Sequence, residues 1–129
     1  RATGLTKLNE DIVVPRGKLV ELVDFCEGLQ QECGMPIACF GHAGDGNIHV
    51  NIMVEDIEIE ENRKRSDEAL DQLFKKVLSM GGVVSGEHGI GIAKKRWFED
   101  ALDEGSLDLH KRLKSVLDPE SNLNPGKFV

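Results

Sequence analysis

The segment 59–80 carries the most regular pattern in the chain, and this pattern requires a second structural layer. Six apolar residues recur at three- and four-residue spacing, so they share one face of a helix: Ala69, Leu70, Leu73, Phe74, Val77 and Leu78. Acidic residues open the segment and lysines close it, as the helix dipole favours, and Gly81-Gly82 ends it. A helix with one apolar face must bury that face against a sheet or other helices.

Short β-branched or apolar runs between turn residues predict the strands of that second layer. The expected strands are residues 9–15, 37–40 and 48–54, with a stub at 83–84. A helix is expected over residues 19–29, where apolar residues recur at helical spacing before Gly34 and Pro36.

The last helix is predicted to begin with Ser106 as its N-cap and to stop before Pro119. Its inward face would consist of Leu109, Leu113, Val116 and Leu117. The tail 118–129 contains two prolines and a glycine and is expected to be extended. This order of elements predicts an α+β fold of ferredoxin-like type: an open, mainly antiparallel sheet with helices on one face.

Length and charge limit the classes of function. A chain of 129 residues with 40% hydrophobic residues suits one domain with a real core, and its net charge of −7 disfavours nucleic acid and anionic lipid as partners. No apolar run is long enough to cross a bilayer, and no basic-then-apolar leader opens the chain. We therefore expect a cytoplasmic location, peripheral to a membrane only through partners, and a first residue other than Met suggests a fragment of a longer protein.

Three cysteines, Cys26, Cys33 and Cys39, form an odd number without an export signal, which predicts free thiols. Cys26 and Cys33 lie on the apolar side of the helix expected at 19–29 and its continuation, where we expect both to be buried as small hydrophobic groups. The chain has no CxxC spacing, which argues against a redox or metal role.

Two glycine-rich loops hold three of the four histidines. The first reads GHAGDGNIH over residues 41–49 and the second SGEHGIG over residues 85–91. Glycines permit a tight backbone, so His42 and His49 can converge on one point, and Glu87 with His88 stands in the second loop. The fourth histidine, His110, is expected at the surface.

Two histidines with one carboxylate match a mononuclear site for a divalent ion such as Zn, Mn, Fe or Co. The alternative is that these residues only cap and turn the backbone, as Asp45-Gly46-Asn47 would do in many proteins. Motifs for other chemistry are missing: the sequence has no HExxH and no GxSxG, and the glycines of the second loop run in the reverse order of GxGxxG.

The two loop motifs, together with DPESNLNPGK at 118–127 and EDIVVPRGKL at 10–19, resemble the family of FAD-linked oxidase C-terminal domains. That family includes the flavoprotein subunit of glycolate oxidase, D-lactate dehydrogenases and D-2-hydroxyglutarate dehydrogenase. The resemblance covers nearly the whole chain. It implies that this is the C-terminal substrate and metal domain, residues 1–129, of an FAD-dependent 2-hydroxy-acid dehydrogenase.

The resemblance also assigns roles to single residues. It implies that His42, His49 and Glu87 hold a divalent metal, Zn or Mn, and that His88 removes the proton of the substrate hydroxyl group. It places Asn47 and Asn124 near the flavin.

The same resemblance makes Lys7 the candidate partner of the substrate carboxylate. It implies that the N-terminal FAD-binding domain is absent here, so FAD would belong to the full-length protein, and the chain alone would be inactive. Expected partners are that domain, a small 2-hydroxy acid and a subunit that accepts electrons.

Two other classes of function use the same residues. A metal-dependent hydrolase could use the two histidines and the carboxylate to activate a water molecule. A non-catalytic metal-binding module would need only the ligands. Flavin in the full-length protein would distinguish an oxidoreductase from both.

Overall fold

A computed structural model describes residues 4–127 of the chain. The chain divides into two compact units, residues 1–87 and residues 88–129. No change of composition marks this boundary, which falls inside the second glycine-rich loop.

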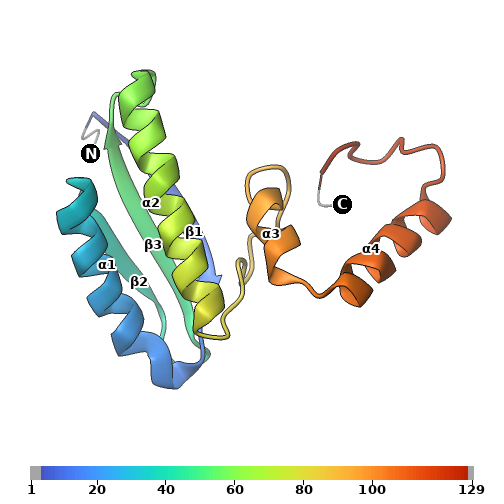
Figure 1. Cartoon of the computed structure of the whole chain (residues 1–129), viewed down its shortest axis with the longest axis horizontal. Helices are drawn as coiled ribbons and strands as arrows, with labels where there is room; N and C mark the ends of the chain where they lie inside the picture. Colours follow the sequence, from blue (N-terminus) through green and yellow to red (C-terminus); the bar gives the residue numbers. More distant parts are fainter. Residues whose placement is uncertain (1–3, 128–129) are drawn as a thin grey trace. The chain divides into compact units, whose positions relative to one another are not determined.

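The first unit contains an antiparallel sheet of three strands in the order β1-β3-β2. These strands are β1 (Leu5–Val13), β3 (Asn47–Glu55) and β2 (Ile37–His42). A 3-10 turn (Arg16–Lys18) leads from Pro15 into helix α1 (Leu19–Cys33), and α2 (Glu60–Ser79) follows the sheet in sequence. Both helices lie on one face of the sheet (Figure 1).

The hydrophobic core lies between this sheet face and the two helices. Alternate residues of β3 point to opposite sides, and those on the helix side are almost fully buried: Ile48, Val50, Ile52 and Val54. On the helices, the buried apolar set includes Leu22 of α1 and Leu73, Phe74 and Val77 of α2. The predicted α+β fold with helices on one face is thereby confirmed.

The opposite face of the sheet is polar. It carries Asn47, His49 and Asn51 from β3, and strand pairing sets Asp11 of β1 beside His49 and His42 of β2 beside Asn47. Residues directly opposite one another in an antiparallel pair share a face. The register therefore gathers the histidines of the first loop on the side of the sheet that the helices leave open.

The expected strand stub at 83–84 is reduced to one bridge between Val13 and Val83. The two residues exchange backbone hydrogen bonds of 3.2 and 2.8 Å. Beyond Val83 the backbone N–H groups of Gly86 and Glu87 bond to the side chain of Asp11 instead of to strand backbone. A carboxylate thus takes over the acceptor role that a fourth strand would have found in β1.

The strand boundaries differ from the sequence expectation. β1 begins at Leu5 rather than at residue 9, because pairing with β3 supports the polar residues of its first half. It ends at Val13, since Val14 donates to the carbonyl oxygen of Gly46 at 3.1 Å and Pro15 has no N–H to donate. β2 runs on to His42, so this histidine lies in a strand rather than in the turn.

Both helices of the first unit end close to where the sequence predicts. Gly34 adopts a left-handed conformation, φ 66°, and its N–H bonds to the carbonyl oxygen of Gln30 at 3.0 Å, which closes α1. The expectation of burial holds for Cys26 but is wrong for Cys33, which is half-buried at the last turn of α1.

The second unit contains α3 (Lys95–Ala101), which the sequence analysis did not predict, and α4 (Glu104–Leu117). The predicted N-cap of α4 is wrong: the cap is Asp103, whose carboxylate accepts the N–H and O–H of Ser106 at 2.9 and 2.6 Å. His110 of α4 is half-buried, with Nδ1 2.7 Å from the carbonyl oxygen of Ser106 and its ring edge-on to Phe98 of α3.

The apolar residues of α4 that were expected to face inward are exposed in the structure. Leu109 and Leu113 are 54% and 53% exposed, and Val116 and Leu117 are 76% and 78% exposed. Periodicity identified the apolar face correctly, but no layer formed by the described residues 88–127 covers it.

The tail beyond α4 is turned rather than extended, which corrects the sequence expectation. Asp118 is the organising residue, since its two carboxylate oxygens accept the backbone N–H groups of Asn122 and Leu123 at 2.9 and 3.0 Å. Lys114 also bonds to this carboxylate, and that hydrogen bond is the main reason why the pKa of Asp118 is lowered. Among residues 4–127, no helix has the length and apolar character needed to cross a membrane.

We predict that a link between α1 and α2 makes stability depend on acid pH. Hydrogen bonds from Lys18 and then Lys76, at 2.8 and 2.7 Å, lower the pKa of Glu21 from 4.5 to about 2. A lowered folded-state pKa adds stability above the unfolded value, and that stability is lost as the pH falls from 4.5 toward 2. Thermal unfolding midpoints should therefore fall less steeply over this window in Glu21→Gln than in wild type.

The matched control is Glu32→Gln, an exposed carboxylate on α1 without an ion pair among the described residues. It should keep the wild-type slope. Because Glu21 is 43% exposed, the difference should shrink at high salt. An unchanged slope in Glu21→Gln at low salt would contradict the assignment.

Candidate functional site

A buried carboxylate positions the second glycine-rich loop. Asp11 is 0% exposed, and its Oδ2 accepts hydrogen bonds from the N–H groups of Glu87 and Gly86 at 2.7 and 2.9 Å and from the hydroxyl of Ser85 at 3.2 Å. Three hydrogen bonds thus converge on one buried oxygen atom. The peptide units of Gly86 and Glu87 are therefore held at a fixed place beside β1.

Gly86 is required for this approach. A Cβ atom at this position would lie 2.7 Å from Oδ1 of Asp11 and 2.9 Å from Oδ1 of Asn47. Such distances are shorter than van der Waals contact, and both neighbours are buried. The loop can come this close to the sheet only because the residue has no side chain.

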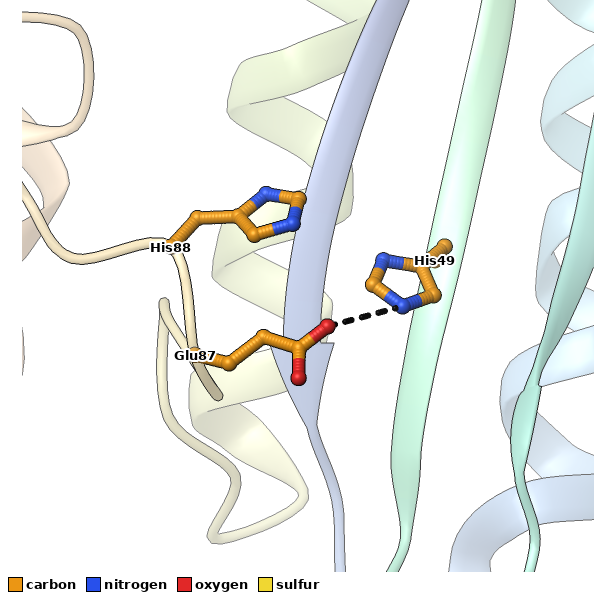
Figure 2. Close-up of side chains that lie close together, drawn as sticks. All are labelled: His49, Glu87 and His88. Carbon is orange, nitrogen blue, oxygen red and sulfur yellow. Dashed lines mark ion pairs between the residues drawn. The ribbon is translucent and has the colours of Figure 1, made fainter.

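The consequence is a contact between the two loop motifs. Oε1 of Glu87 lies 3.3 Å from Nε2 of His49, and the two side chains are 56% and 12% exposed (Figure 2). On its other side, the His49 ring tilts against Phe40 of β2, with 5.3 Å between ring centroids. The imidazole is thus held by a neighbouring ring and presents one nitrogen to the carboxylate.

His88 is joined to Glu87 by a peptide bond and is the first residue of the second unit. His49, Glu87 and His88 each offer one ligand atom, and these atoms lie within 4.8 Å of one another (Figure 2). These three residues come from two segments that are far apart in sequence. The structure therefore brings together two of the three predicted metal ligands and the predicted base.

His42, the third predicted ligand, lies outside that cluster and is exposed. It is the last residue of β2, and its carbonyl oxygen accepts the N–H groups of Asp45 and Gly46 at 3.2 and 3.1 Å in the tight turn. Gly46 has φ 82°, and a Cβ there would overlap with the carbonyl oxygen of Val14. His42 lies diagonally across from His49 on the same sheet face, at a separation that a side-chain rotation can shorten.

Asn47 is buried beside this cluster at 8% exposure. Its backbone N–H bonds to Oδ1 of Asp45 at 3.1 Å, but its own side-chain oxygen has no hydrogen-bond partner among the described residues. A buried acceptor without a partner is unfavourable, typically by about 1–3 kcal/mol. A ligand with an N–H or O–H group would remove that cost.

The remaining predicted site residues lie elsewhere. Lys7 is exposed on β1, on the same sheet face as Asp11 and four residues away, or about 13 Å along the strand. Asn124 is in the second unit, exposed, in a left-handed conformation with φ 49°. Their roles stay predictions.

Sequence analysis missed two residues of the site. Asp11 gave only a weak signal, since it stands next to Glu10 in the polar part of its strand, directly before the apolar run Ile12–Val14. Phe40 gave none, because an aromatic residue in a strand is usually part of the core, whereas Phe40 is 53% exposed and packs on His49.

Chemically, the site offers imidazole nitrogens and a carboxylate at the polar face of a sheet, beside a buried amide oxygen. In a tetrahedral site with both donors about 2.1 Å from the ion, the donors lie about 3.4 Å apart. The 3.3 Å between His49 and Glu87 fits this value. The fold and the site thus define an α+β domain whose polar sheet face presents an imidazole and a carboxylate, two groups of the kind that ligate divalent ions.

The chain belongs to the family of FAD linked oxidases, C-terminal domain, which matches residues 1–128. It is 37% identical over 118 residues to a D-lactate dehydrogenase of Anaerostipes hadrus, and the aligned region covers 92% of this chain and 25% of the relative. It is 36% identical over 123 residues to the glycolate oxidase subunit GlcD of Bacillus subtilis, with 95% and 26% covered. A D-lactate dehydrogenase of Archaeoglobus fulgidus is 38% identical over 119 residues, with 92% and 26% covered.

The chain thus spans about a quarter of the length of these curated relatives. The resemblance seen in the loop motifs is confirmed at the level of the family.

We predict that Gly86→Ala displaces the second loop. The added methyl group meets two buried oxygens, and such overpacking lowers the free energy of unfolding by about 1–3 kcal/mol. The imidazole resonances of His49 should shift in the same variant, because Glu87 moves with the loop. Chemical denaturation and NMR measure the two effects.

Gly28→Ala is the matched control, because Gly28 lies within α1 and an added Cβ meets nothing within 4 Å. It should stabilise the chain by about 0.5–1 kcal/mol through the better helix propensity of alanine. Equal stability of Gly86→Ala and wild type, with unmoved His49 signals, would show that the loop does not need this close approach.

Proposed function

We propose that this chain is the substrate-side domain of an FAD-dependent dehydrogenase that oxidises the hydroxyl group of a small 2-hydroxy acid to a keto group. The observation that carries the proposal is the contact between His49 and Glu87, held in place by Asp11. Family membership and relatives named for D-lactate and glycolate point to the substrate class. No observation on the described residues favours a hydrolase.

The ligands of a divalent ion, Zn or Mn, are proposed to be His49, Glu87 and His42. The first two already stand at a suitable separation, and His42 completes the set by rotating on the same sheet face. A bound ion would supply a Lewis acid that binds the substrate hydroxyl and carboxylate groups and lowers the hydroxyl pKa. With two imidazoles and one carboxylate, open positions remain for the substrate.

His88 is proposed as the general base. It follows Glu87 directly, so the anchor at Asp11 fixes the backbone that carries it. Its unprotonated imidazole nitrogen would take the proton of the substrate hydroxyl as the keto group forms. FAD, held by the rest of the full-length protein, would accept the hydride from the substrate carbon.

Three further residues are proposed to bind and orient the substrate or the flavin. Lys7, the positive charge on the open sheet face, would pair with the substrate carboxylate. Asn47 would use its buried side-chain oxygen to accept a hydrogen bond from the flavin or the substrate, and Asn124 would approach the flavin from the second unit.

The partners of the full-length protein are proposed on the same basis. They are its own FAD-binding domain and a subunit that accepts electrons, since one relative is named as a subunit of glycolate oxidase. We propose a cytoplasmic location, with contact to a membrane only through such partners.

We predict that Glu87→Gln lowers the metal content of the full-length protein. A neutral amide is a much poorer ligand than a carboxylate. Loss of a residue that only hydrogen-bonds to a metal ligand already lowers metal affinity by roughly 10–100-fold, so loss of the ligand itself should lower it by at least as much. Elemental analysis after dialysis against Zn²⁺ or Mn²⁺ measures this without reference to activity. Glu55→Gln, at the far end of β3, should retain wild-type metal content.

The same assay on His42→Ala, His49→Ala and the double variant tests the other two ligands. Unchanged metal in the double variant, in protein with wild-type circular dichroism, would refute the proposed ligand set. Chelation should abolish turnover of the wild-type protein, and added Zn²⁺ or Mn²⁺ should restore it.

We predict that His88→Ala leaves metal and flavin content near wild type and lowers kcat by roughly 10²–10⁴-fold. The fall of kcat at acid pH should also disappear, because the group that must be unprotonated is gone. Stopped-flow reduction of the flavin, per metal-loaded enzyme, measures the step directly.

His110→Ala is the control, a half-buried histidine of α4 bonded within its own helix. It should leave flavin reduction unchanged. If His88 only shapes the Gly86–Gly91 loop, its removal reduces stability while kcat per folded enzyme stays within a few-fold of wild type.

A further inference from the structure

Two cysteines 13 positions apart in sequence meet between α1 and β2, away from the candidate site. Cys26 of α1 is 2% exposed, and Cys39 of β2 is half-buried. Cys39 pairs with Val50 across the sheet, which places it on the helix-covered face, where it lines the same cavity as Cys26. The Cys26 thiol can act there as a hydrogen-bond donor to an ionised Cys39. The sequence has no CxxC motif that would reveal this pair, since the fold rather than local sequence brings the two cysteines together.

The pair opens to a cavity. Both cysteines line a volume of about 240 Å³ whose other walls are Val23, Glu27, Gln30 and Ile37. A dithiol sealed in the core would be inert, whereas these sulfurs adjoin a space that a small reagent can enter. Cys39 is the more exposed of the two.

The hydrogen bond gives the two thiols unequal chemistry. It lowers the pKa of Cys39, because the thiol of Cys26 donates to the Cys39 thiolate, and it raises the pKa of Cys26 for the same reason. Burial opposes the thiolate at Cys39, and the charge of Glu27 at the cavity opposes it further. The accessible cysteine is therefore the better nucleophile, and the buried one is held protonated until that charge is removed.

We propose that Cys26 and Cys39 form a redox-active dithiol that a low-molecular-weight disulfide oxidises to an intramolecular disulfide. The Cys39 thiolate attacks one sulfur of the reagent, a mixed disulfide forms, and the other half leaves as a thiolate that takes a proton from water. Cys26 then loses its proton to solvent and attacks the Cys39 sulfur, which releases the second half. The cysteines give up two electrons and two protons, and the reagent becomes two thiols.

The order of the steps follows from the hydrogen bond. Once Cys39 is in a mixed disulfide it carries no negative charge, so the interaction that held Cys26 protonated disappears. Both cysteines line one cavity, and a disulfide needs about 2 Å between the sulfurs, an approach that side-chain rotation within the cavity would supply. The bond would link α1 to the edge strand β2. The residue after Cys39 in this strand, Phe40, packs on His49 at the opposite face of the sheet.

The test equilibrates the chain in glutathione buffers of increasing oxidised fraction, traps free thiols with an alkylating reagent and maps peptides by mass spectrometry. The expected product is one crosslink between Cys26 and Cys39 with Cys33 alkylated. Cys33→Ser is the matched control: this half-buried cysteine of α1 bonds only weakly to backbone oxygens, at 4.0 and 3.9 Å, and its loss should leave the crosslink unchanged. Three free thiols at the most oxidising buffer, or a crosslink to Cys33, would overturn the proposal.

Cys26→Ala separates the two roles. In this variant Cys39 should accumulate as a mixed disulfide with glutathione, and its alkylation at neutral pH should be slower than in wild type, because the donor that stabilises its thiolate is gone. Circular dichroism confirms that the variant is folded, and Cys26→Ser provides a less disruptive replacement if it is not. Alkylation of Cys39 at the wild-type rate in a folded Cys26 variant would refute the coupling between the two thiols.

Discussion

The carboxylate of Asp11 is the interaction on which the candidate site depends. It is fully buried in β1, and it accepts two backbone N–H groups and one hydroxyl from the second glycine-rich loop. A buried polar group is tolerated when it is hydrogen-bonded, and here the bonds to Oδ2 are made by a loop more than seventy residues away in sequence. The same bonds take the place of the backbone hydrogen bonds that a fourth strand would have made to β1. One side chain therefore limits the sheet at this edge and also positions the loop that carries Glu87.

The two faces of the sheet serve different purposes. The helix-covered face is a close-packed core of branched aliphatic residues, and stability comes from there. The open face holds the polar residues, and strand pairing alone sets His49 between Asp11 and Phe40. A rigid strand is a precise support for a ligand, because its side chain is fixed by neighbours on both sides.

The proposed dithiol would connect the two faces of the sheet. Cys39 lies on the helix side of β2, and the adjacent Phe40 lies on the site side. Consecutive residues of a strand point to opposite faces, so a covalent change at one is next to a contact at the other. A change at Cys39 can therefore affect the contact between Phe40 and His49 directly through the strand, without a chain of contacts through the core.

Sequence by itself determined the three strands, the helices α1, α2 and α4 with their apolar faces, the family motifs and the residue kinds of the site, since these depend on periodicity, turn chemistry and local spacing. It did not predict α3. Tertiary structure decided what depends on contacts between distant segments. It paired His49 with Glu87, left His42 apart, revealed Asp11 as the anchor and joined Cys26 to Cys39. It also left the apolar face of α4 exposed, because a periodic pattern shows which side of a helix is apolar but not what covers it. Register and packing between segments, which no local pattern encodes, are the physical reason for that division.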